Sequence, residues 1–264
     1  MITPSKDVMG GSVPVEGQVL TEEEYKRYAN MPPVADPFWV SILYGDMGSR
    51  KTTTACSMVN ERGLLLSSDG SWKVLLNNRH RELKDKIDIV KLESLSQIKY
   101  LKLEGYDTII WDTASQSVDE FLDLVYDEAD WAGQFRTKIN TKNKELKDLS
   151  TLAPVDYRVT RDATRPYFNK LFKETEAHII FTSQLTDPMP GLSANQQKRP
   201  AIPASTFKII GTRADIVALT TVNGNNAFVD VTQNLTQLGK TRIEGIQGKM
   251  TQDAFIKAYK ETVF

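Results

Sequence analysis

The segment from Phe38 to Arg62 constrains the fold more than any other part of the chain. It contains an apolar run, FWVSILY, a glycine-containing turn, GDMGSRKTT, and a helix-forming stretch. A buried strand that enters a tight turn and continues as a helix is typical of parallel α/β sheets. The backbone N–H groups that begin such a helix favour anions. The segment therefore predicts an anion-binding turn within an α/β fold.

The glycine turn follows the pattern G-x-x-x-x-G-K-[ST] of a P-loop, with Arg50 in place of the second glycine. The pattern assigns Lys51, an expected catalytic residue, to the β and γ phosphates of ATP, and the hydroxyl of Thr52 to Mg²⁺. An ordinary glycine turn, or a loop that Arg50 strains or blocks, is the alternative. The residues expected to bind the nucleotide are Gly45, Asp46, Met47, Gly48, Ser49, Arg50, Lys51, Thr52 and Thr53.

Polar residues follow three later apolar runs, where they are expected to complete such a site. Asp112 follows TIIW and is expected to hold Mg²⁺ opposite Thr52. Because Thr113 rather than an acid comes next, we expect Asp69, after GLLLSS, to be the base that activates water. Gln184, after HIIFTS, is expected to contact the γ-phosphate or its water. The alternatives are a helix cap for Asp112, a turn residue for Asp69 and a solvated glutamine.

Apolar runs alternate with helical segments along the rest of the chain. We expect strands at 38–44, 63–67, 87–92, 108–111 and 178–182, and helices at 51–62, 95–104, 115–129, 163–176 and 251–262. The runs 216–220 and 227–232 flank NGNN and predict a C-terminal β-hairpin. This alternation predicts a mostly parallel central sheet flanked by helices. The expected domain covers residues 37–264, and residues 1–36 are expected to form an N-terminal arm with a short helix.

Composition restricts how the chain can bind nucleic acid and which cellular compartment we expect for it. The net charge is -1, from 33 basic and 34 acidic residues, so nucleic-acid binding requires a local basic patch. A single cysteine, Cys56, excludes an intrachain disulfide. No apolar run is long enough for a membrane span, so we expect a cytoplasmic protein, in the host cytoplasm if it is viral.

Taken in order, GDMGSRKTT, the acid after GLLLSS, YDTIIWDT and HIIFTSQ resemble the RecA-like P-loop ATPases. More closely, the chain looks like the phage nucleotide-binding, AAA-type ATPases of the single-strand-annealing recombination group. The resemblance implies a RecA-like fold, use of ATP and Mg²⁺, action on single-stranded DNA and self-assembly into a ring or filament. It also implies that Asp69 is the base and that Gln184 senses the γ-phosphate.

The resemblance places the DNA contacts in two loops, 130–160 and 185–205. Phosphate neutralisation requires cations, and both loops supply them. The alternative for these cations is that they are ordinary solvated charges. The alternative for the function is a packaging-related motor or scaffold with slow or no turnover. Arg213 is expected either to reach a neighbour's nucleotide or to pair with Asp215. The loop cations are Arg136, Lys138, Lys142, Lys144 and Lys147 in the first loop, and Lys198 and Arg199 in the second.

Overall fold

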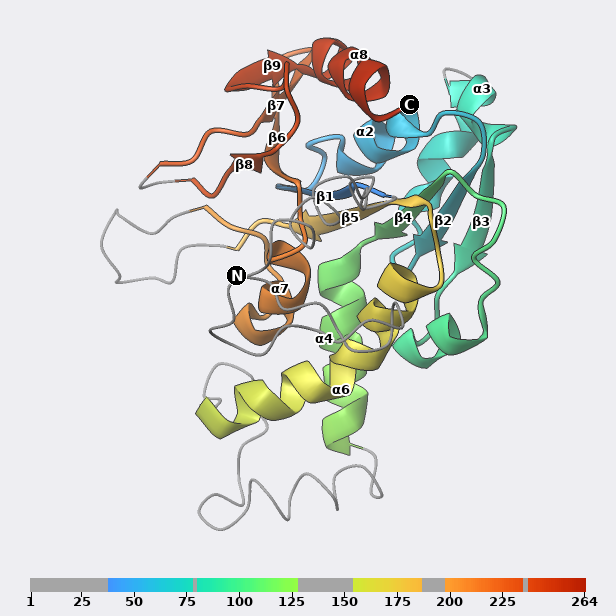
Figure 1. Cartoon of the computed structure of the whole chain (residues 1–264), viewed down its shortest axis with the longest axis vertical. Coiled ribbons are helices and arrows are strands. Elements are labelled where there is room, and N and C mark those ends of the chain that lie inside the picture. The colour runs from blue at the N-terminus through green and yellow to red at the C-terminus, as the bar shows by residue number, and fades with distance from the viewer. Residues whose placement is uncertain (1–37, 78–79, 128–153, 187–197, 235–236) are drawn as a thin grey trace, which may run out of the picture. The chain divides into compact units, whose positions relative to one another are not determined.

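The structure is a computed structural model that describes residues 38–77, 80–127, 154–186, 198–234 and 237–264 (Figure 1). The predicted N-terminal arm, most of the first predicted DNA loop and the middle of the second lie outside these ranges.

A sheet of nine strands forms the centre of the described chain, and most of its pairings are parallel. It confirms the α/β class, the mostly parallel sheet and the C-terminal hairpin. In spatial order the parallel strands are β3 (Ile87–Lys91), β2 (Gly63–Ser67), β4 (Thr108–Asp112), β5 (His178–Gln184), β1 (Val40–Gly45) and β6 (Ile216–Asn223). The antiparallel strands are β7 (Asn226–Asp230), paired with β6, β9 (Lys249–Thr251), paired with β7, and β8 (Lys240–Thr241), paired with β6.

Helices cover both faces of the sheet because its central strands are apolar on both sides. Every residue of β1, β2 and β4 is buried, which is expected of parallel strands enclosed between helix layers. One core lies against α4 (Ala114–Asp127), α6 (Pro154–Lys173) and α7 (Ala204–Gly211). The other lies against α2 (Lys51–Met58) and α8 (Gln252–Val263), on the opposite face in Figure 1. The other helices of the described residues are α3 (Arg81–Lys84) and the 3-10 helices η1 (Ser71–Leu76) and η3 (Leu95–Tyr100).

Parallel register brings the polar strand ends to one edge of the sheet. Gly45 at the end of β1 is level with Gln184 at the end of β5. Ser67 at the end of β2 is level with Asp112 at the end of β4. Segments that are far apart in sequence therefore deliver their polar residues to the same carboxyl edge.

The helix after the glycine turn is shorter than predicted, ending at Met58 instead of residue 62. The carboxylate of Asp107 explains the difference, because it accepts hydrogen bonds from the backbone N–H groups of residues 60–62, at 2.6 to 3.4 Å. Gly63 begins β2 and does not cap the helix. A Cβ on Gly63 would lie 2.7 Å from a methyl carbon of Val59, so close packing requires this glycine.

Other boundaries also differ from the predictions. The helix predicted at 95–104 is η3, a 3-10 helix whose N-cap Ser94 accepts a hydrogen bond from the N–H of Ser96. The helix predicted from residue 163 begins at Pro154. The prediction missed α7, β8 and β9, which are too short for hydrophobic periodicity to show.

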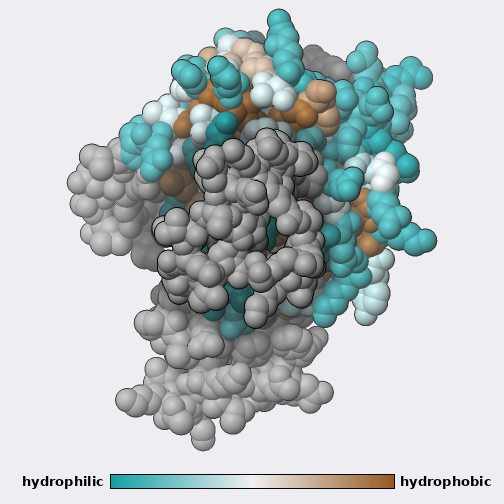
Figure 2. All heavy atoms as spheres, in the orientation of Figure 1, coloured by the Kyte–Doolittle hydropathy of each residue, from teal (hydrophilic) through white to brown (hydrophobic). Residues whose placement is uncertain are grey.

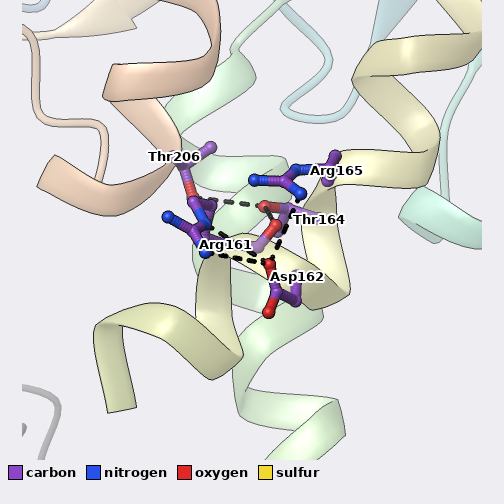
Figure 3. Close-up of polar contacts among 5 residues, drawn as sticks. All are labelled: Arg161, Asp162, Thr164, Arg165 and Thr206. Carbon is purple, nitrogen blue, oxygen red and sulfur yellow. Dashed lines mark hydrogen bonds and ion pairs between the residues drawn. The ribbon is translucent and has the colours of Figure 1, made fainter. Parts of the chain in front are cut away.

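Two buried hydroxyls join α6 to α7 (Figure 3). The Oγ1 atoms of Thr164 and Thr206 lie 3.3 Å apart, and Thr164 also donates to the carbonyl of Arg161. On the exposed side of the joint, Asp162 accepts hydrogen bonds from Arg161 and lies 3.8 Å from Arg165. Since α7 follows the second predicted DNA loop, this joint anchors the downstream end of that loop.

Hydrophilic side chains cover most of the described surface in the view of Figure 2, and hydrophobic atoms lie mainly where Figure 1 draws β9 and α8. None of the described helices has the length and apolarity needed to cross a lipid bilayer. Among the described residues, the large hydrophobic side chains that are exposed are Met47, Leu76, Ile89, Tyr100, Val222 and Phe264.

His178 is packed at the start of β5, where its contacts give it a structural role. Its Nδ1 accepts a hydrogen bond of 2.9 Å from the N–H of Trp39, and its ring meets that of Phe264 edge-on. Burial lowers the pKa of His178, and the charge of Asp107 opposes this only in part. Below the ordinary histidine pKa of about 6.5, His178 is therefore protonated in the unfolded chain but still neutral in the native chain, until the pH reaches its lower native pKa.

We predict that this histidine makes the fold less stable as the pH falls. Its contribution is fully present above about pH 6.5 and declines as the pH falls toward the native pKa. In His178→Asn, the amide oxygen replaces Nδ1 as acceptor and does not titrate. Urea unfolding at about pH 7.5 and about pH 5.5 should show a smaller loss of stability in the variant than in the unaltered chain. Equal losses would contradict the prediction.

Candidate active site

A cavity of about 500 Å³ lies at the carboxyl edge of the sheet. This volume is within the usual range for sites that bind small molecules and cofactors. The expected catalytic residues Lys51, Asp69, Asp112 and Gln184 all line it. The other lining residues are Met47, Gly48, Arg50, Thr52, Thr53, Ser71, Val74, Thr113 and Gln116. The fold therefore brings together the residues that the sequence picked out from four separate segments.

The glycine turn holds two left-handed backbone conformations. Gly48 has φ 77° and Arg50 has φ 65°. The carbonyl of Arg50 accepts hydrogen bonds from both the N–H and the Oγ1 of Thr54, each at 2.8 Å. Arg50 is thus the N-cap of α2, and the first N–H groups of that helix have no partner within the helix. The departure from the motif lies in the side chain, because the backbone keeps the conformation that favours glycine.

Strand β6 supports the turn from the side opposite β5. The Oγ atoms of Ser49 and Thr220 lie 2.8 Å apart and are buried, and Thr220 also donates to the carbonyl of Tyr44. A Cβ on Gly45 would lie 2.4 Å from the carbonyl oxygen of Thr220. Sequence reasoning missed Thr220, because a hydroxyl that follows an apolar run such as IVAL is common and does not by itself indicate a site.

The amine of Lys51 points back along the turn. It donates to the carbonyl oxygens of Gly45 at 2.9 Å and Asp46 at 2.8 Å. Burial lowers the pKa of Lys51, while the charges of Asp112, Asp46 and Asp69 act in the opposite direction. The site therefore surrounds a buried cation with carboxylates.

Asp112 is 1% exposed, and hydroxyls from three elements satisfy its carboxylate. Thr52 of α2 donates to Oδ2 at 2.8 Å, Ser71 of η1 donates to the same oxygen, and Thr182 of β5 donates to Oδ1. Burial raises the pKa of Asp112, and these hydrogen bonds oppose that effect. A cis peptide bond joins Asp112 to Thr113. Ser71 and Thr182 were not among the residues expected from the sequence.

Asp69 lies beside this cluster and shares Ser71 with it. Its Oδ1 accepts a hydrogen bond from the N–H of Ser71 at 2.9 Å, and its Oδ2 accepts one from Thr113 at 2.6 Å. Burial alone would raise the pKa of Asp69, but the hydrogen bonds from Ser71 and Thr113 together lower it. The contact with the N–H of Ser71 is also what the turn-residue interpretation predicts, so Asp69 fits both interpretations.

Gln184 is exposed at the rim of the cavity, where the second predicted DNA loop begins. Its N–H donates to Oγ of Ser115 at 3.2 Å, and its carbonyl accepts from the N–H of Ala201 at 2.8 Å. The N–H of Thr186 donates to the carbonyl of Arg199 at 3.0 Å. Backbone hydrogen bonds thus join the two ends of the loop next to Gln184. Lys198 and Arg199 lie at the C-terminal end of the loop and are exposed.

Comparison with known proteins identifies a family for this part of the chain. A family model described as an AAA domain matches residues 38–243, which include every residue that lines the cavity. The chain belongs to the AAA domain family. Among curated proteins, none matches its sequence. A crystal structure of the RadB recombinase is similar at a TM-score of 0.40, with 9% sequence identity, over 73% of this chain and 79% of that chain.

Of the two interpretations of Arg213, the ion pair with Asp215 was wrong. Asp215 does not pair with Arg213, because its carboxylate accepts hydrogen bonds from Arg242 at 3.1 Å and from the N–H of Val40 at 2.9 Å. The guanidinium of Arg213 lies instead 4.7 Å from the ring centre of Phe172.

We predict that the two glycines of the turn differ in their tolerance of a side chain. Gly45→Ala should destabilise the AAA domain by about 1–3 kcal/mol, because the new Cβ overlaps the backbone of β6. Gly48→Ala meets no atom within 4 Å, so only its left-handed backbone opposes the change, at about 1 kcal/mol. Urea unfolding of both variants measures the difference, and a larger loss in Gly48→Ala would show that the turn does not pack on β6 as described.

Proposed function

We propose that the chain binds ATP with Mg²⁺ in this cavity and hydrolyses it, and that it uses ATP to act on single-stranded DNA in phage recombination or replication. One observation carries the nucleotide proposal. The lysine and threonine of the P-loop meet a buried strand-end carboxylate in one cavity, where the hydroxyl of Thr52 lies 2.8 Å from Asp112. Membership of the AAA domain family supports the same chemistry.

The oxygen donors at this position fit a magnesium ion. Mg²⁺ prefers oxygen ligands and is usually bound by one or two carboxylates together with substrate phosphates. Thr52 and Asp112 would supply the protein ligands. Within the described ranges, no three His, Cys, Asp or Glu side chains gather as a self-sufficient metal site, so the phosphates would complete the coordination. When bound, the ion neutralises charge that develops on the phosphates.

Lys51 and the start of α2 would hold the phosphates. The amine of Lys51 now donates to two neutral carbonyls, and phosphate oxygens are stronger acceptors because they are charged. The neighbouring carboxylates oppose the loss of its proton on burial. The unpartnered N–H groups at the start of the helix add further donors.

Asp69 would accept the hydrogen bond of the attacking water, and Gln184 would orient that water or the terminal phosphate. A general base works best when its pKa lies near the working pH, and the pKa of Asp69 is lowered. This favours slow turnover. It also supports the alternative of a packaging-related motor or assembly scaffold that binds nucleotide and hydrolyses it slowly or not at all.

The DNA proposal rests on the predicted loop that begins at Gln184. Backbone hydrogen bonds between the two loop ends bring the segment with Lys198 and Arg199 near Gln184, which lines the cavity. Nucleotide state at Gln184 would thereby alter the loop, whose cations neutralise DNA phosphates. Self-assembly into a ring or filament, the extent of the domain at residues 37–264 and a cytoplasmic location belong to the same proposal.

We predict that nucleotide binding depends on Lys51. Lys51→Ala should weaken ATP binding by about tenfold or more, since charged hydrogen bonds contribute about 1.5–3 kcal/mol each. Asp112→Asn should retain binding but lose its dependence on Mg²⁺. Isothermal titration with a non-hydrolysable ATP analogue, with and without Mg²⁺, measures both effects. A Lys51→Ala variant that binds as tightly as the unaltered chain would refute the site.

A second prediction separates the DNA function from the alternative. Single-stranded DNA should raise the rate of ATP hydrolysis several-fold and increase the oligomer size in the presence of the ATP analogue. Replacing Lys198 and Arg199 together by alanine should reduce this stimulation and leave nucleotide affinity unchanged. If nucleotide binds but DNA changes neither rate nor oligomer size, the motor or scaffold interpretation is favoured.

A further inference from the structure

Arg50 combines an enforced left-handed backbone with a loosely held side chain. Its φ of 65° is fixed from both sides, since Thr54 binds its carbonyl and Ser49 is tied to Thr220. It cannot relax to a right-handed conformation without disrupting the start of α2. Strain of this kind persists where the surrounding structure determines the conformation. A glycine would hold the same backbone without steric penalty, so the role of Arg50 must lie in its guanidinium.

The guanidinium connects the P-loop to the β6–β7 hairpin. Its Nη2 donates to the carbonyl oxygen of Asn225 at 3.2 Å, at an exposed site. Asn225 lies in the turn of the hairpin, between the paired residues Asn223 and Asn226. The link spans 175 residues of sequence and joins Arg50 directly to the hairpin tip.

This link is the weaker of two that Arg50 can make. A hydrogen bond to a neutral carbonyl at an exposed site contributes little, because water competes for both groups. A phosphate accepts two parallel charged hydrogen bonds from the planar guanidinium, which is the stronger interaction. Arg50 lines the same cavity as Lys51 and Thr52, so a phosphate bound there competes with Asn225 for one side chain.

We propose that Arg50 couples the terminal phosphate of a bound nucleoside triphosphate to the hairpin tip. The guanidinium holds the tip through the carbonyl of Asn225, and the terminal phosphate draws it away and releases the tip. This inference rests on the proposed nucleotide binding. It goes beyond it by naming the residue that distinguishes triphosphate from diphosphate and the element that responds.

Only the tip is expected to respond. The root of the hairpin remains fixed through the hydroxyl pair of Ser49 and Thr220 and through the pairing of β6 with β1. Residues 222–226 are all exposed and include Val222, a large apolar side chain that is 40% exposed. Release would therefore free an exposed turn without unfolding the sheet.

Hydrogen exchange measured by mass spectrometry tests the coupling. The full chain is compared alone, with Mg²⁺ and ADP, and with Mg²⁺ and a non-hydrolysable ATP analogue. We expect the analogue, but not ADP, to speed exchange at residues 222–226. Peptides from residues 45–53 serve as the internal control, because both nucleotides should protect them.

Variants of Arg50 separate the guanidinium from the backbone. In Arg50→Ala the tip should exchange rapidly in all three states, and the preference for triphosphate over diphosphate should fall by about tenfold. Arg50→Gly should show the same exchange and the same loss of preference, and it removes the backbone strain. It therefore tests the role of the guanidinium even if the alanine variant folds poorly. Arg50→Lys keeps the charge but not the planar fork, so it should restore the preference only in part. Asn225→Ala keeps the carbonyl, and its tip should behave as in the unaltered chain.

The outcomes distinguish this inference from the function on which it rests. If the P-loop peptides are protected but the tip exchanges equally in every state, the coupling is wrong and nucleotide binding stands. The same conclusion follows if Arg50→Ala and Arg50→Gly exchange like the unaltered chain. If neither nucleotide protects residues 45–53, the proposed nucleotide binding fails, and the coupling fails with it.

Discussion

Asp112 carries a carboxylate that is almost fully removed from water at the end of β4, and the carboxyl edge of the sheet is organised around it. A buried charge without partners costs several kcal/mol. Here Thr52, Ser71 and Thr182 donate hydroxyls from α2, η1 and β5. Satisfying one charge thus fixes the start of the helix after the P-loop, the segment that carries Asp69 and the strand that leads to Gln184. The need to solvate the buried carboxylate of Asp112 thus positions the groups that are proposed to bind phosphate, metal and water.

Strand order determines which segments can meet at this edge. β5 lies between β1 and β4, so its hydroxyl at Thr182 reaches Asp112 while its last residue lies level with Gly45. β6 lies on the other side of β1 and supplies Thr220 to the P-loop. The P-loop is therefore supported from both sides, and the two proposed couplings lead from it to two different places. One is the loop after Gln184, and the other is the hairpin after β6.

The sequence predicted the central strands well and the helix ends less well. Strands such as β2 and β4 are continuous apolar runs bounded by polar residues, so their own composition defines them. α2 ends early because Asp107, a residue far along the chain, captures the N–H groups that follow it. α7 was missed because a helix of eight residues shows too little periodicity. The pairing of Arg213 with Asp215 was wrong, since Arg242, which follows β8, donates to the carboxylate of Asp215 instead.

The P-loop shows most directly what the sequence decided by itself. Its glycines, Lys51 and Thr52 form a contiguous pattern in which each residue type has one local task, so the pattern alone predicts an anion-binding turn. Asp112, Asp69 and Gln184 were also recognisable, because each follows an apolar run. Ser71, Thr182 and Thr220 were not, since hydroxyl residues are common and their spacing carries no signal. Only the fold brings those hydroxyls to a carboxylate or a turn, and only the fold places the carbonyl of Asn225 next to Arg50. Contacts between groups so far apart in sequence depend on strand order and register, which no local pattern specifies.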